Sequence, residues 1–130
     1  MSLDGLSVAG AHILTAFARA ATVLGRDLTV TSGSDGTHSG PADPHHRGNA
    51  IDVRSKDLEP DDKARVLQIV MEELRRVSLS YGADGGMVNA SGGRVAGIFF
   101  GFLEAPGTIN EHFHVQLRRG RTLPQETYDV

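Results

Sequence analysis

Residues 111–117 read Glu-His-Phe-His-Val-Gln-Leu, and this stretch decides the predicted fold. Successive side chains of an extended strand point to opposite faces of a sheet. His112 and His114 therefore share one face, whereas the core face takes Phe113, Val115 and Leu117. The pattern predicts a half-buried strand whose polar face carries two imidazoles.

The other elements favour an α+β fold. Apolar residues at helical spacing predict a helix over residues 8–24, with Ser7 as its N-cap and Gly25 as its stop. A second helix is expected to begin near Pro60, because proline suits a first helical turn. Strands are expected over residues 28–32, 49–53, about 95–103 and 112–117, and a glycine-rich connection over 82–93. Because about four strands and two helices do not alternate regularly, we expect a small antiparallel sheet with helices packed on one face.

Composition limits the classes of protein that this chain can belong to. Its 130 residues suit one domain over residues 1–130, with 39% hydrophobic and 22% charged residues. A net charge of −3 gives no general attraction to nucleic acid or to an anionic membrane, and no apolar run reaches membrane length. The absence of cysteine excludes disulfides, thiolate zinc fingers and a cysteine nucleophile. We expect no nucleic-acid partner and no membrane insertion, and the oligomeric state stays open.

The histidine pair in residues 111–117 indicates a site of chemistry. Two imidazoles on one face repel each other when protonated and cost desolvation when covered, and a metal ion relieves both problems. Glu111 adds a carboxylate three residues before His114. The competing interpretation is an ordinary half-buried strand whose polar side chains face solvent.

Residues 45–52 form a second cluster, His-His-Arg-Gly-Asn-Ala-Ile-Asp, with the pattern H-x-x-G-x-A-x-D. In an extended chain Gly48, Ala50 and Asp52 share one face, and the two small residues leave room beside the carboxylate. An imidazole nitrogen of His45 and an oxygen of Asp52 are suitable zinc ligands. Alternatively, Asp52 pairs with a nearby arginine and the histidines are ordinary loop residues.

Together the two clusters resemble a family of zinc peptidases. H-x-x-G-x-A-x-D followed by a distal [DE]-H-x-H is similar to the zinc D-alanyl-D-alanine carboxypeptidases, the VanX-type dipeptidases and the phage endolysins. Hedgehog signalling domains share the fold and the metal site of this group. The resemblance extends over roughly residues 30–117 and includes residues 31–38 and the run Asp52-Val53-Arg54. It implies a hedgehog-like fold.

The resemblance also implies roles for individual residues. One zinc ion would be held by His45, Asp52 and His114, with a water in the fourth position. Glu111 matches the general base, and His112 matches the histidine that stabilises the oxyanion.

The chain departs from the family pattern at three places. Glu104 occupies a position where related patterns carry a further glutamate, but its seven-residue separation from Glu111 is longer than usual, and it is the alternative base. His46 stands where an aromatic residue is common. The family arginine that binds a substrate carboxylate is missing, because Ser34 and Asp35 occupy its region. The candidates to bind substrate are Arg54, Arg47, Arg94 and His38.

The function that this resemblance implies is hydrolysis of peptidoglycan stem peptides or related D-amino-acid peptides, as a carboxypeptidase or an endopeptidase. The alternative is a non-catalytic, zinc-stabilised binding module of hedgehog-like fold. Because no signal peptide is visible, we expect a protein that is cytoplasmic as encoded and reaches the cell wall only after release. A metal-free domain with an incidental histidine cluster is the third hypothesis.

Overall fold

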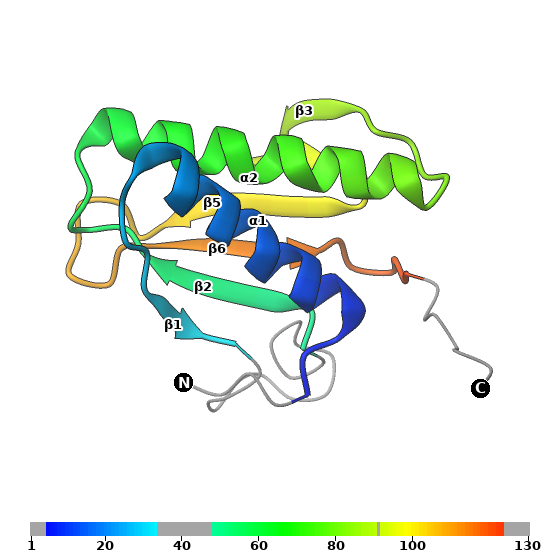
Figure 1. The fold of residues 1–130 in the computed structure, drawn as a ribbon, viewed down its shortest axis with the longest axis horizontal. Coiled ribbons are helices and arrows are strands. Elements are labelled where there is room, and N and C mark those ends of the chain that lie inside the picture. Colours follow the sequence, from blue (N-terminus) through cyan, green and yellow to red (C-terminus); the bar gives the residue numbers. More distant parts are fainter. Residues whose placement is uncertain (1–4, 34–47, 91, 124–130) are drawn as a thin grey trace.

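The computed structural model describes residues 5–33, 48–90 and 92–123, and in these ranges the chain forms two helices and six strands (Figure 1). The helices are α1 (Val8–Leu24) and α2 (Pro60–Ser80). The strands are β1 (Val30–Ser32), β2 (Ala50–Arg54), β3 (Met87–Ala90), β4 (Gly93–Ala96), β5 (Phe99–Glu104) and β6 (His112–Leu117). An antiparallel sheet joins them in the order β1-β2-β6-β5-β4-β3. The predicted α+β class and antiparallel pairing are confirmed.

The ends of both helices follow from local sequence. The Ser7 hydroxyl accepts a hydrogen bond from the Gly10 amide, and Gly25 closes α1 in the left-handed conformation, with φ +62°. Pro60 begins α2, and the first turn carries Asp61 and Asp62, whose charge suits the positive end of the helix. Within the described residues, neither helix has both the length and the apolar character needed to cross a membrane.

The hydrophobic core lies between the two helices and one face of the sheet. Helix α1 crosses β2 and β6, and helix α2 lies over β4 and β5 (Figure 1). On β6 the buried residues are Phe113, Val115 and Leu117, which contribute to the same core as Phe17 of α1 and Leu74 of α2. The alternation predicted for β6 is therefore confirmed. Its other face, with His112 and His114, points away from the helices.

The sheet has two more strands than the sequence predicts. The stretch predicted as one strand over residues 95–103 is a hairpin, because Gly97 and Ile98 form a two-residue turn between β4 and β5. Gly97 has φ +60°, and a side chain there would meet the Ser78 hydroxyl at 2.2 Å, so glycine is required. The predicted connection over residues 82–93 contains β3, which pairs with β4.

Candidate functional site

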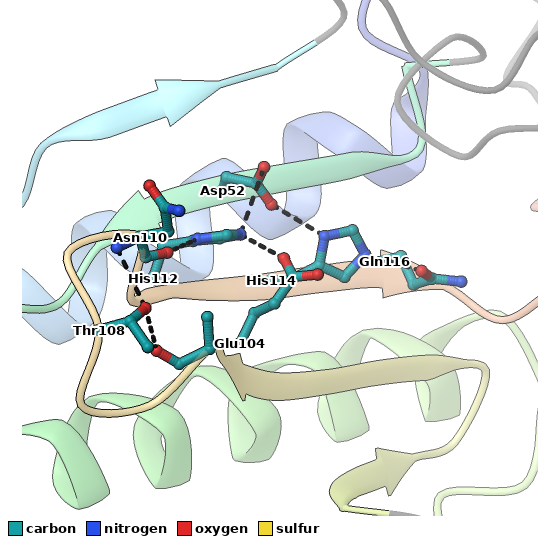
Figure 2. A network of polar contacts seen from close by, with 8 residues as sticks. Asp52, Glu104, Thr108, Asn110, His112, His114 and Gln116 are labelled. Atoms are coloured by element: carbon teal, nitrogen blue, oxygen red, sulfur yellow. Dashed lines mark hydrogen bonds and ion pairs between the residues drawn. The ribbon is translucent and has the colours of Figure 1, made fainter.

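Polar side chains from three strands meet on the open face of the sheet (Figure 2). Asp52 of β2 lies directly opposite His114 of β6. In the next row, His112 lies between Arg54 of β2 and Glu104 of β5. Directly opposed residues of antiparallel strands share a face, so the strand register gathers these five side chains on the side of the sheet away from the helices.

Two of the predicted zinc ligands, Asp52 and His114, contact each other. The His114 Nδ1 atom lies 2.8 Å from Asp52 Oδ1, and the two side chains are only 12% and 15% exposed. On the other side of the ring, His114 Nε2 lies 2.7 Å from the Gln116 Oε1 atom. The Phe102 ring packs against the imidazole with 5.2 Å between centroids. Three neighbours thus fix the orientation of His114.

His112 faces acceptors through both ring nitrogens. Its Nδ1 donates a hydrogen bond of 2.6 Å to the Asn110 carbonyl, which can only accept, so Nδ1 carries a proton. Its Nε2 contacts Glu104 Oε2 and lies 3.8 Å from Asp52 Oδ2. Nε2 of His112 thus faces the carboxylates of Glu104 and Asp52 on the open face of the sheet.

Glu111 points to the other side of β6, toward helix α2. Its carboxylate is 4% exposed and lies 2.8 Å from the Lys63 Nζ atom. It also accepts hydrogen bonds from the Ser55 hydroxyl at 2.8 Å and from the Gly107 amide at 3.2 Å. This buried ion pair ties the β5–β6 loop to α2 and to the end of β2. Glu111 does not join the group around His112.

The hydrogen bonds to Glu111 lower its pKa from the ordinary 4.5 to about 2. The Lys63 ammonium is the largest cause, followed by the Ser55 hydroxyl and the Gly107 amide, and burial opposes them. The carboxylate is therefore ionised throughout the neutral range and binds a proton weakly.

Within the described residues, the open face carries two of the three predicted zinc ligands, Asp52 and His114. Two ligand atoms of a tetrahedral zinc ion lie about 3.4 Å apart, because each bond is about 2.1 Å long. The Nδ1 and Oδ1 atoms of His114 and Asp52 already lie at 2.8 Å, so a small movement would fit them to one ion. The described residues hold no group of three His, Asp or Glu side chains arranged for a metal. The third predicted ligand, His45, lies outside the described residues.

The structure thus brings together Asp52, His112 and His114, with Glu104 beside them and the Glu111 carboxylate turned toward α2. His38, His45 and Arg47 lie outside the described residues, so their predicted roles stay predictions. Arg94 of β4 lies opposite Gly101 of β5, which in turn lies opposite the buried Val115 of β6. Arg94 therefore belongs to the face of the sheet that is turned toward the helices, not to the open face.

Sequence reasoning did not assign Gln116 or Lys63. Gln116 continues the alternation of His112 and His114 along β6, and this spacing is a signal that was present in the sequence. The pairing of Lys63 with Glu111 joins residues 48 positions apart, and no local pattern indicates it.

Comparisons with known proteins give no match: no family model fits the chain, and no similar curated protein or solved structure was found. Function is therefore inferred from the motifs and from the geometry of the open face.

The lowered pKa of Glu111 predicts how stability depends on pH. A carboxyl group with a depressed folded-state pKa stabilises the protein above its unfolded pKa, and this stabilisation is lost as pH falls toward the folded pKa. At neutral pH, wild type should have a larger free energy of unfolding than Glu111→Gln. This difference should disappear between about pH 5 and pH 2, because protonated glutamate resembles glutamine. Urea unfolding at several pH values measures this difference.

Glu72 is exposed on α2, so Glu72→Gln is the control. The difference in free energy of unfolding between wild type and Glu72→Gln should change little with pH. A difference between wild type and Glu111→Gln that stays constant from neutral pH to pH 2 would contradict the buried ion pair.

Proposed function

We propose that the protein is a zinc-dependent peptidase that hydrolyses peptidoglycan stem peptides or related D-amino-acid peptides. The observation that supports this most is the contact of Asp52 with His114 on the open face, beside the Glu104–His112 pair. Two ligand-type side chains thus lie beside a carboxylate and an imidazole, and metal-assisted hydrolysis needs such a combination of ligands and proton-transfer groups.

Asp52 and His114 would hold the zinc ion, together with His45 as the resemblance implies. Zinc bound there supplies Lewis acidity toward a peptide carbonyl and acidifies water. The chain's own part is to hold these ligands in place: β2 and β6 fix the backbones of Asp52 and His114, and neighbouring side chains fix the ring.

Glu104 suits the role of general base better than Glu111 does. A general base works best when its pKa lies near the working pH, and a pKa of about 2 makes Glu111 a weak proton acceptor. Glu104 is 46% exposed and contacts His112 on the open face. It would take a proton from the attacking water and return it to the leaving amine. His112 would then donate a hydrogen bond to the developing oxyanion.

A cationic cavity beside His112 suits a substrate carboxylate. The cavity measures about 210 Å³, and its lining includes the cationic side chains of Arg54 and Lys56, together with Asn110, His112 and Glu111. The Glu111 carboxylate is neutralised by Lys63 at 2.8 Å, so Arg54 and Lys56 supply the positive charge for a substrate carboxylate. Arg54 pairs with Asp57 only at 3.6 Å, across an exposed pair of little stabilising value. Its guanidinium can therefore exchange that partner for a substrate. Because Arg54 lies directly opposite His112, the cavity favours a carboxylate close to the scissile bond.

Replacing each glutamate in turn tests the assignment of the base. Glu104→Gln should keep about one zinc ion per chain while muropeptide cleavage, followed by mass spectrometry, falls about 10²- to 10⁴-fold. Glu111→Gln should retain cleavage at neutral pH, where the variant is folded.

Three outcomes would contradict either the assignment of Glu104 as the base or the proposed zinc peptidase activity. Full activity of Glu104→Gln, with a folded but inactive Glu111→Gln, would return the base role to Glu111. A wild-type protein that binds zinc and releases no fragment would be a binding module. Absence of bound zinc would favour the metal-free hypothesis.

Removing the Arg54 guanidinium tests the carboxylate cavity. A hydrogen bond to a charged group contributes about 1.5–3 kcal/mol, so Arg54→Ala should raise KM at least tenfold for peptides with a free C-terminal carboxylate. For the same peptides with an amidated C-terminus, Arg54→Ala should change KM little. Arg65→Ala, on the exposed side of α2, is the control. Equal increases in KM for both peptide forms would contradict the binding of a substrate carboxylate in this cavity.

A further inference from the structure

Gln116 is the polar residue next to His114 along the open face of β6. We propose that Gln116 is a positioning residue that holds the His114 imidazole through Nε2, so that Nδ1 is the nitrogen presented to the metal. This inference rests on the proposed function, because it concerns the zinc ligand His114, and it assigns a role to a residue outside the predicted ligand set.

The hydrogen bonds of Gln116 fix which end of its amide faces the imidazole. The Gln116 amide nitrogen donates to the Leu117 carbonyl at 3.2 Å. A carbonyl oxygen only accepts, so the NH₂ group must lie on that side and Oε1 must lie on the other. Oε1 lies 2.7 Å from His114 Nε2. Since Oε1 also only accepts, Nε2 must be the donor and carries the proton.

This contact fixes which ring nitrogen meets Asp52. With Nε2 held by Gln116, Nδ1 lies on the opposite side of the ring, 2.8 Å from the Asp52 Oδ1 atom. Nδ1 is therefore the ring nitrogen that a metal held by His114 and Asp52 would use. Gln116 holds the ring in the orientation that offers this atom.

Ligand histidines in metal sites commonly donate their second N–H to a fixed acceptor, and loss of that acceptor costs about 10- to 100-fold in metal affinity. Gln116 is built into the same strand as His114, two residues away, so the acceptor and the ligand move together. Leu117, whose carbonyl orients the amide, is buried in the core. The orientation of the ligand is therefore tied to the packing of β6.

Zinc affinity, measured by competition with a chelator, tests this inference without an activity assay. Gln116→Met keeps the length of the side chain but removes the acceptor, and affinity should fall about 10- to 100-fold. Gln116→Glu retains an acceptor oxygen and should restore wild-type affinity or exceed it. Gln68→Met, at an exposed position on α2, is the matched control and should bind zinc as wild type does.

Loading the ¹⁵N-histidine-labelled chain with ¹¹³Cd²⁺ shows which ring nitrogen binds. We expect coupling of cadmium to Nδ1 of His114 and a protonated Nε2. Coupling to Nε2, or an unchanged zinc affinity of Gln116→Met, would overturn this inference and leave the proposed function standing. A wild-type chain that binds neither metal would overturn both.

Discussion

Strand β6 is paired on both sides, so each of its side chains belongs either to the hydrophobic core or to the open face of the sheet. Phe113, Val115 and Leu117 are buried beneath the helices. A shift of one residue in register would move these apolar side chains into water and the histidines into the core. The cost of that exchange holds His112 and His114 on the open face. The same register places Asp52 beside His114 and Glu104 beside His112.

The alternation of β6 also separates Glu111, the general base that the resemblance implies, from Glu104, the alternative base. Glu111 is three residues from His114 along the chain, yet its carboxylate lies on the helix side, where Lys63 neutralises it. Glu104 is ten residues away along the chain and lies next to His112, because the β5–β6 pairing brings it there. The buried ion pair supports the loop between these strands, and the Glu104 carboxylate is partly exposed on the open face. Under the proposed function, Glu111 stabilises the site and Glu104 is the general base.

Local signals in the sequence predicted much of this fold. Ser7, Gly25 and Pro60 mark helix ends correctly, because caps and proline act through their own backbone. Strand β6 was predicted with its bounds, because its alternation is strict. The strand count was wrong at Gly97, since a lone glycine within an apolar run gives little indication of a two-residue hairpin.

The site was harder to predict, because it depends on contacts across the sheet. The face of His112 and His114 follows from their spacing alone. The direction of Glu111 depends on Lys63 and on the end of β2, which lie far away in sequence. The role of Gln116 depends on the orientation of its amide, and spacing carries no information about that. Zinc binding, peptide hydrolysis and the hedgehog-like fold stay predictions from the motifs.

Zinc content is the most direct test of the claim that Asp52 and His114 form a metal site. Elemental analysis of the purified wild-type chain, after incubation with zinc and removal of the free ion, should give about one zinc ion per chain. His114→Ala treated in the same way should retain far less, because it lacks one of the ligands. Equal zinc content in the two proteins, or none in wild type, would contradict the account.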